Sequence, residues 1–135
     1  MFVFACLTGI SYIDIKNLTT DNLVNINGSW WIVANRKKTK VPFRVKLLDS
    51  ALRIIERYEP FRNGNRLFYL HANTYINRAL KVIAKECGID KPLSFHCSRH
   101  TFSTLALSKG MPIESVSKIL GHTKITTTQI YAKIT

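Results

Sequence analysis

Residues 23–48 constrain the fold most, because they have the pattern of β-strands within a sequence that is otherwise helical. Leu23–Ala34 is interrupted at Asn27-Gly28, a pair typical of a tight hairpin turn. Val41–Leu48 is predicted to be the partner strand, and Pro42 places that strand at an edge of the sheet or at its own start. We therefore predict a small antiparallel β-sheet in this part of the chain.

The remaining sequence shows helical spacing of apolar residues, with glycine or proline where each helix would end. The first helix of the second half is expected to be capped by Asp49. The expected helices are 2–9, Asp14–Leu18, Ser50–Tyr58, Thr74–Cys87, Ser98–Lys109, Pro112–Leu120 and Thr127–Lys133. The predicted fold class is therefore mostly α with a small antiparallel β-sheet (α+β), in one domain over residues 1–135.

The chain carries a strong excess of positive charge. Its 135 residues include 20 Lys and Arg against 8 Asp and Glu, which gives a formal net charge of +12. Such a surface attracts a polyanion, and nucleic acid is the commonest candidate. No apolar run reaches the roughly 18–20 residues of a membrane span, and no basic amphipathic helix stands out, so no membrane partner is expected.

The three cysteines, Cys6, Cys87 and Cys97, are odd in number and have no CxxC spacing. Cys6 and Cys87 lie among apolar residues and are predicted to fill the core as free thiols, which indicates a reducing cytoplasm. Cys97 is interpreted as a small packing residue rather than a catalytic thiol. Because no second cysteine has zinc-finger spacing beside it, no metal site is predicted.

Four residues in the last third of the chain have the chemistry of a phosphate-cleaving site. His96 and Arg99 are three residues apart, so they share one face of a helical turn. Arg99 can hold two phosphate oxygens with its forked donors, and His96 can move a proton near neutral pH. His122 follows Gly121 and can donate to the same phosphate. Tyr131 would be the nucleophile, and a phosphotyrosyl ester would keep the energy of the broken strand without ATP or metal.

The segment Ser94–Ala132 resembles the catalytic motif of the tyrosine recombinase (phage integrase) family, and Met111–Tyr131, MPIESVSKILGHTKITTTQIY, is especially similar to integrases of conjugative transposons. Thr8-Gly9 is similar to the family's first motif. The resemblance implies the catalytic-domain fold of these enzymes and DNA integration or excision through a 3′-phosphotyrosyl intermediate, with no cofactor. It also implies that Tyr131 is the nucleophile.

The same resemblance implies roles for the other site residues. His96, Arg99 and His122 correspond to the second- and third-motif residues of the family. The lysine that protonates the leaving 5′-oxygen corresponds to Lys38, with Lys37 as the alternative, because hairpin registers can slip by one residue.

One position departs from the family pattern. The family's first arginine falls at Ser11, which has no guanidinium, whereas Asp14 matches the acidic residue that follows it. Asp14 either braces the site or faces solvent. Either another basic side chain, such as Lys16 or one from the hairpin, completes the phosphate clamp, or the protein is slow or inactive. The alternative function is therefore a catalytically impaired DNA-binding module of the same fold. A type IB topoisomerase uses similar chemistry and is less favoured.

Basic residues outside this site are expected to contact double-stranded DNA. The predicted hairpin tip carries Arg36, Lys37, Lys38 and Lys40, and a later helix carries Arg78, Lys81 and Lys85 on one face. Contacts of this kind position DNA without reading its sequence. Members of the family usually also have an N-terminal DNA-clamping domain and a C-terminal tail. We therefore expect residues 1–135 to be the catalytic domain of a longer protein that self-associates on DNA.

Overall fold

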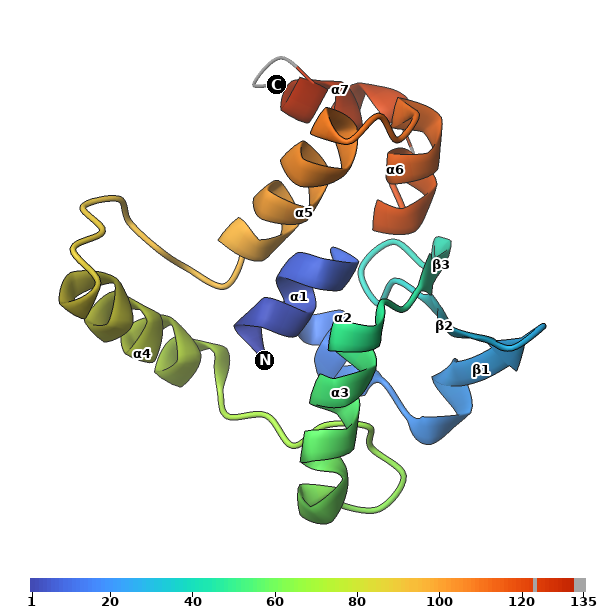
Figure 1. The fold of residues 1–135 in the computed structure, drawn as a ribbon, viewed down its shortest axis with the longest axis horizontal. Helices are drawn as coiled ribbons and strands as arrows, with labels where there is room; N and C mark the ends of the chain where they lie inside the picture. Colours follow the sequence, from blue (N-terminus) through green and yellow to red (C-terminus); the bar gives the residue numbers. More distant parts are fainter. Residues whose placement is uncertain (123, 133–135) are drawn as a thin grey trace.

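The computed structural model describes residues 1–122 and 124–132, with residues 131 and 132 as backbone only. It confirms a mostly helical chain with one small sheet (Figure 1). The first half contains α1 (Phe2–Thr8), α2 (Tyr12–Asn17), the 3-10 turn η1 (Thr20–Asn22), β1 (Leu23–Ile26), β2 (Ser29–Asn35) and β3 (Pro42–Lys46). The second half contains α3 (Asp49–Tyr58), η2 (Glu59–Phe61), α4 (Asn73–Glu86), α5 (Cys97–Ser108), α6 (Ile113–Leu120) and α7 (Ile125–Ala132).

The three strands form an antiparallel sheet in the order β1-β2-β3, as the sequence predicts. Asn27 and Gly28 both have positive φ, 52° and 84°, and this pair of conformations makes the two-residue turn between β1 and β2. Pro42 pairs with Asn35 as the first residue of the edge strand β3, so both expectations for this proline are confirmed.

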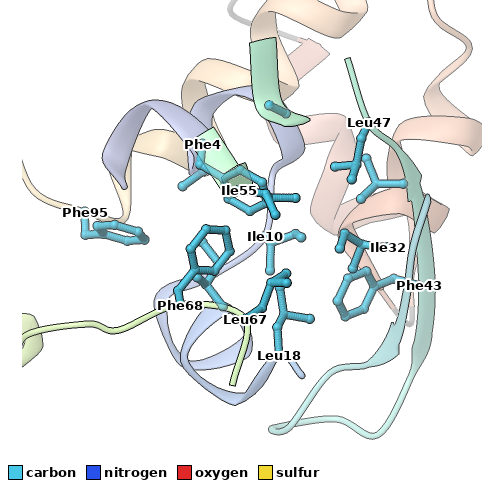
Figure 2. Close-up of a cluster of buried hydrophobic side chains, with 14 of the residues drawn as sticks. Phe4, Ile10, Leu18, Ile32, Phe43, Leu47, Ile55, Leu67, Phe68 and Phe95 are labelled. Atoms are coloured by element: carbon cyan, nitrogen blue, oxygen red, sulfur yellow. The ribbon is translucent and has the colours of Figure 1, made fainter. Parts of the chain in front are cut away.

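A continuous apolar core lies between the sheet and the first three helices (Figure 2). Ile32 and Phe43 project from β2 and β3 toward Ile10 and Leu18, while Phe4 of α1 lies on the other side of the cluster. These five side chains are at most 4% exposed. At about 25 cal/mol per Å² of apolar area removed from water, such side chains supply the main driving force for folding.

Two sequence predictions about α3 and α4 are wrong. Asp49 is the first helical residue of α3, Leu48 occupies the cap, and no side chain caps this end. Leu80 and Ala84 of α4 are buried, whereas Ile83 is 51% exposed, and Cys87, which is predicted to fill the core, is exposed just after the helix end. Helix α4 lies to one side of the other helices and the sheet (Figure 1), and the face that carries Ile83 is not covered by another described element.

The last three helices pack together beside α1 and the edge of the sheet. Helix α5 contacts both α1 and α7, and α6 contacts α7 and β3. Helix α6 ends at Gly121, whose φ of 68° is left-handed, and α7 begins at Ile125, two residues before the predicted start. This arrangement brings the ends of α1 and α6 against the first turns of α5. None of the described helices is both long and apolar enough to cross a bilayer.

Candidate active site

Arg99 lies at the centre of the site and is held by two helix ends. Its Nη1 donates to the Gly9 carbonyl at 2.8 Å, and its Nη2 donates to the Leu120 carbonyl at 2.9 Å. Both carbonyls lie at helix C-termini, where backbone acceptors have no intrahelical partner and favour positive charge. Arg99 is 5% exposed. A guanidinium has five N–H donors, so bonds to two carbonyls and to a phosphate are compatible.

Gly9 is required at the end of α1 for two reasons. Its φ of 74° is left-handed, and a Cβ built there would lie 2.6 Å from Cδ1 of Phe102. The preceding Thr8 is fully buried and donates to the Phe4 carbonyl at 2.9 Å. The Thr8-Gly9 pair therefore ends α1 in the position where its last carbonyl receives Arg99.

His122 lies beside Arg99 just after the end of α6. Its Nε2 is 3.5 Å from Nη2 of Arg99, and its Nδ1 is 2.6 Å from Oγ1 of Thr128. Burial, then the charges of Arg99 and Arg36, lower the pKa of His122 to about 4. His122 is therefore neutral at physiological pH, and in that state it can donate from only one ring nitrogen at a time.

His96 is the N-cap residue of α5, one turn before Arg99. Partial burial lowers its pKa, and the nearby charges of His100, Arg99 and Arg36 lower it further. The backbone before it is held from α4, because Phe95 N donates to Oδ1 of Asn77 at 2.7 Å. The charges of Arg99 and Arg36 thus act on both His96 and His122, and His96 and Arg99 lie on one helical turn, as their spacing predicts.

Asp14 braces the site and does not face solvent. It is 5% exposed and receives hydrogen bonds from Ser11 Oγ at 2.7 Å and from Lys37 N at 2.9 Å. Its Oδ2 is also 3.6 Å from Nε of Arg36. One carboxylate therefore joins α2 to the base of the β2–β3 hairpin and binds Ser11, the residue at which the resemblance places the family's first arginine.

Arg36, which the sequence predicted as one of several basic hairpin residues that could complete the clamp or contact DNA, lies beside His122 and Asp14. Its Cγ and Cδ pack over Gly121, where an added Cβ would lie 2.9 and 2.6 Å from them. Its side chain is 17% exposed, and its charge lowers the pKa of both His96 and His122. Among the described residues, Arg36 Nε is the one buried side-chain nitrogen or oxygen without a hydrogen-bond partner.

The other basic residues that we predict to contact DNA lie on exposed surface. Lys37, Lys38 and Lys40 are on the hairpin tip, and Arg78 and Lys81 are on α4. The three hairpin ammonium groups form no ion pair with any described side chain. Their charges are therefore not neutralised by any described acidic side chain.

Two further sequence predictions concern Tyr131, the predicted nucleophile, and Cys97, the predicted packing residue. Tyr131 lies in α7, but its side chain is outside the part of the chain that the structure describes. Cys97 is half-buried, with its Sγ 3.5 Å from Ser94 N, so it packs against the turn that precedes α5. No cluster of three His, Cys, Asp or Glu side chains suited to a metal occurs among the residues described.

Comparison with known proteins defines the class to which this fold and site belong. The Phage integrase family model matches residues 1–135, and the chain is a member of that family. It is 31% identical over 142 residues to the tyrosine recombinase XerD of Listeria monocytogenes. This alignment covers 95% of this chain and 47% of that protein. It is 28% identical over 149 residues to XerD of Pseudomonas putida, which covers 98% of this chain and 47% of that protein.

Solved structures of recombinases share the fold. A crystal structure of XerA recombinase superposes with a TM-score of 0.78 at 26% identity, over 96% of this chain and 50% of that one. The Tn1549 transposon integrase, in complex with transposon right end DNA, superposes with a TM-score of 0.77 at 20% identity. The match covers 96% of this chain and 52% of that one. The chain thus spans about half the length of these proteins.

Proposed function

We propose that the protein is a tyrosine-type site-specific DNA recombinase that integrates or excises a mobile element. One observation carries the proposal: Arg99, Arg36 and His122 converge beside Asp14 in a member of the phage integrase family. Two guanidiniums and an imidazole are suited to the extra negative charge of a pentacovalent phosphate. Residues 1–135 form the catalytic domain in this proposal.

In the proposed reaction, Oη of Tyr131 attacks a phosphorus of the DNA backbone and forms a phosphotyrosyl bond to the 3′ side. The bond from phosphorus to the 5′-oxygen breaks, and Lys38 gives that oxygen a proton. His96 accepts the phenolic proton, since its lowered pKa keeps it neutral near pH 7. Attack by the 5′-hydroxyl of a partner strand reverses these steps and completes strand exchange.

Arg36 supplies the guanidinium that Ser11 lacks in this proposal. Its buried Nε has no hydrogen-bond partner among the described residues, and a phosphate oxygen would provide one. Asp14 holds Arg36 through the ion pair and receives the bond from Ser11 Oγ. The serine thus contributes to the same carboxylate that orients the replacement arginine, and the departure from the family pattern does not by itself remove the clamp.

Double-stranded DNA is the proposed substrate and partner. The net charge of +12 and the exposed Lys37, Lys38 and Lys40 favour contacts to the phosphate backbone. Arg78 and Lys81 extend the basic surface along α4. The Tn1549 integrase, which has the same fold, is described in complex with transposon DNA. Self-association on DNA is part of the proposal, because strand exchange needs two cleaved duplexes.

Covalent trapping tests the proposal without knowledge of the target sequence. The full protein that contains these residues is incubated with sheared genomic DNA from its source, denatured, and recovered with any DNA attached to it. Sequencing is expected to show one enriched site for the wild type and none for Tyr131→Phe. An adduct that survives Tyr131→Phe would exclude this tyrosine as the nucleophile.

A DNA-binding module without catalysis is the second candidate, and the serine at position 11 is the observation that favours it. This candidate predicts site-selective binding in a mobility-shift assay with no covalent product from wild-type protein. Relaxation of any supercoiled plasmid, whatever its sequence, would instead indicate a topoisomerase-like enzyme.

A further inference from the structure

Thr128 makes the shortest contact of the His122 ring. Its Oγ1 lies 2.6 Å from Nδ1, whereas Nη2 of Arg99 lies 3.5 Å from Nε2, at the outer limit for a hydrogen bond. Thr128 is fully buried, so no water competes for its hydroxyl. The two residues before it, Thr126 and Thr127, are exposed on the same helix. One threonine of the three is therefore placed to orient the histidine.

The donors around the ring restrict its tautomer. Arginine only donates, so the side of the ring that faces Arg99 favours a lone pair on Nε2, and Nδ1–H then donates to Thr128. A phosphate between Arg99 and His122 reverses the requirement, because Nε2 must then carry the hydrogen. A hydroxyl can accept from Nδ1–H or donate to Nδ1, and it therefore supports the ring in both states.

We infer that Thr128 is a positioning residue that fixes the ring of His122 and lets this histidine, while neutral, present Nε2–H to the scissile phosphate. The inference rests on the proposed function and adds a connection to it. Thr128 and Tyr131 lie one turn apart on α7. The helix that carries the nucleophile therefore also carries the group that prepares His122, so the phosphate clamp is complete only when α7 is docked.

The charged groups that face His122 are Arg99 of α5 and Arg36 of the hairpin, and together with burial they keep the ring unprotonated near pH 7. Without the Thr128 hydroxyl, no hydrogen bond at Nδ1 selects the Nε2–H tautomer of the neutral ring, whereas the imidazolium carries hydrogens on both nitrogens. Removing the hydroxyl should therefore matter most at neutral and alkaline pH, and least in acid.

The experiment compares Thr128→Val, which keeps the shape of the side chain, with Thr128→Ser, which keeps the hydroxyl. Thr127→Val is the matched control on the exposed side of α7. Ring ¹⁵N NMR at pH 7 is expected to show one predominant tautomer of His122, Nδ1–H, in wild type, Thr128→Ser and Thr127→Val. In Thr128→Val the ring signals should shift toward a mixture. This measurement requires no DNA, so it is independent of whether the protein is a recombinase.

The second readout is the rate of covalent adduct formation on the trapped site at saturating DNA. Thr128→Val should slow the rate about 10- to 100-fold at pH 8. This is the range found when the hydrogen-bond partner that orients a metal-bound histidine is removed. Thr128→Ser should restore it to within about threefold, and the deficit of Thr128→Val should shrink toward pH 5. DNA binding should be unchanged.

Three results would overturn the inference: an equal mixture of tautomers in the wild type, an unchanged ring in folded Thr128→Val, or a deficit that is the same from pH 5 to pH 8. If Thr128→Val does not fold, an equal mixture of tautomers in the wild type would still overturn the inference. If wild-type protein forms no adduct at any site while the ring shows the expected tautomer, the proposed function fails and the Thr128 contact stands.

Discussion

Arg99 and Arg36 both approach the proposed phosphate position, but the chain holds them in different ways. Arg99 comes from a helix and is bonded to two buried backbone carbonyls. Arg36 comes from the base of a hairpin, and its guanidinium pairs with one carboxylate 3.6 Å away. Its aliphatic stem packs over Gly121, where a side chain would collide with it. Arg99 is thus part of the folded framework as well as of the site, whereas Arg36 belongs to the site alone.

In the proposed site, this difference would explain how a phosphate clamp tolerates the loss of a family residue. A guanidinium that also satisfies backbone carbonyls cannot be moved without cost, because those acceptors would be left unpaired. A guanidinium on a hairpin needs only a counter-ion and room for its stem. Residue types therefore vary more easily at the hairpin side of the site than at the helix side, and substitutions at both arginines test this contrast.

The largest effect is expected for Arg99→Met. Losing the guanidinium should reduce adduct formation about 10³-fold, the upper end of the range for removal of one oxyanion-hole donor. The Gly9 and Leu120 carbonyls lose their partner as well, which should lower the free energy of unfolding by about 2–4 kcal/mol. Chemical denaturation and covalent trapping measure the two effects. A variant of unchanged stability would contradict the structural half of the comparison.

Arg36→Met should separate activity from stability. Adduct formation is expected to fall about 10²–10³-fold, the range for one lost charged donor, while unfolding changes by less than about 1 kcal/mol. The stability is maintained because Asp14 still receives bonds from Ser11 and Lys37. Adding Ser11→Arg to Arg36→Met should recover part of the activity. Full activity of the single variant would show that Arg36 is not in the clamp.

Gly121→Ala should disturb Arg36 without removing its charge. The left-handed backbone costs an alanine about 1 kcal/mol, and its Cβ would lie 2.6 Å from Cδ of Arg36. We expect lower stability and roughly tenfold slower adduct formation. In an Arg36→Ala background the steric part of this loss should disappear, so a double-mutant cycle should show coupling. Strict additivity would mean that the stem does not pack there.

The smallest effect concerns the pKa of His122, measured by NMR titration. Burial is the main cause of its low value of about 4, and Arg99 contributes more than Arg36. Arg99→Met should therefore raise this pKa more than Arg36→Met does. Because the folded pKa lies below the unfolded value of about 6.5, the unfolded state binds the proton first as the pH falls. Stability from this group is complete above about pH 6.5 and is lost toward pH 4, so His122→Gln should make the melting temperature less sensitive to acid.

Local sequence patterns predicted most of the fold. Asn27-Gly28, Pro42 and the glycines after α1 and α6 each have a local stereochemical role, so their positions in turns, edges and helix ends follow from residue type. The errors occur where a neighbour decides the outcome. Ile83 and Cys87 have core-like spacing on α4, but no second layer covers that part of the helix, and they are exposed.

The site follows the same division. The three-residue spacing of His96 and Arg99 predicted that they share one helical turn. His122 is 23 positions beyond Arg99, and the resemblance to the family motif, not local spacing, predicted its place beside them. Arg36 could be predicted only as a basic residue of the hairpin. Its distance to Asp14 depends on how the hairpin packs against α2 and Gly121, which are separated from it by 22 and 85 positions in the sequence. No local pattern encodes such a contact.

The hydrogen bond from Arg99 to the Gly9 carbonyl joins residues 90 positions apart. The hydrogen bond from Arg99 to the Leu120 carbonyl joins residues 21 positions apart. Neither carbonyl is within reach until α1, α5 and α6 have all packed, so contacts of this range form late in folding. The lysine-rich surface, by contrast, carries its charge from the moment it is synthesised. In the proposed function, a nascent or partly folded chain would therefore hold DNA before it could cut it, and strand breakage would be confined to molecules that have finished folding.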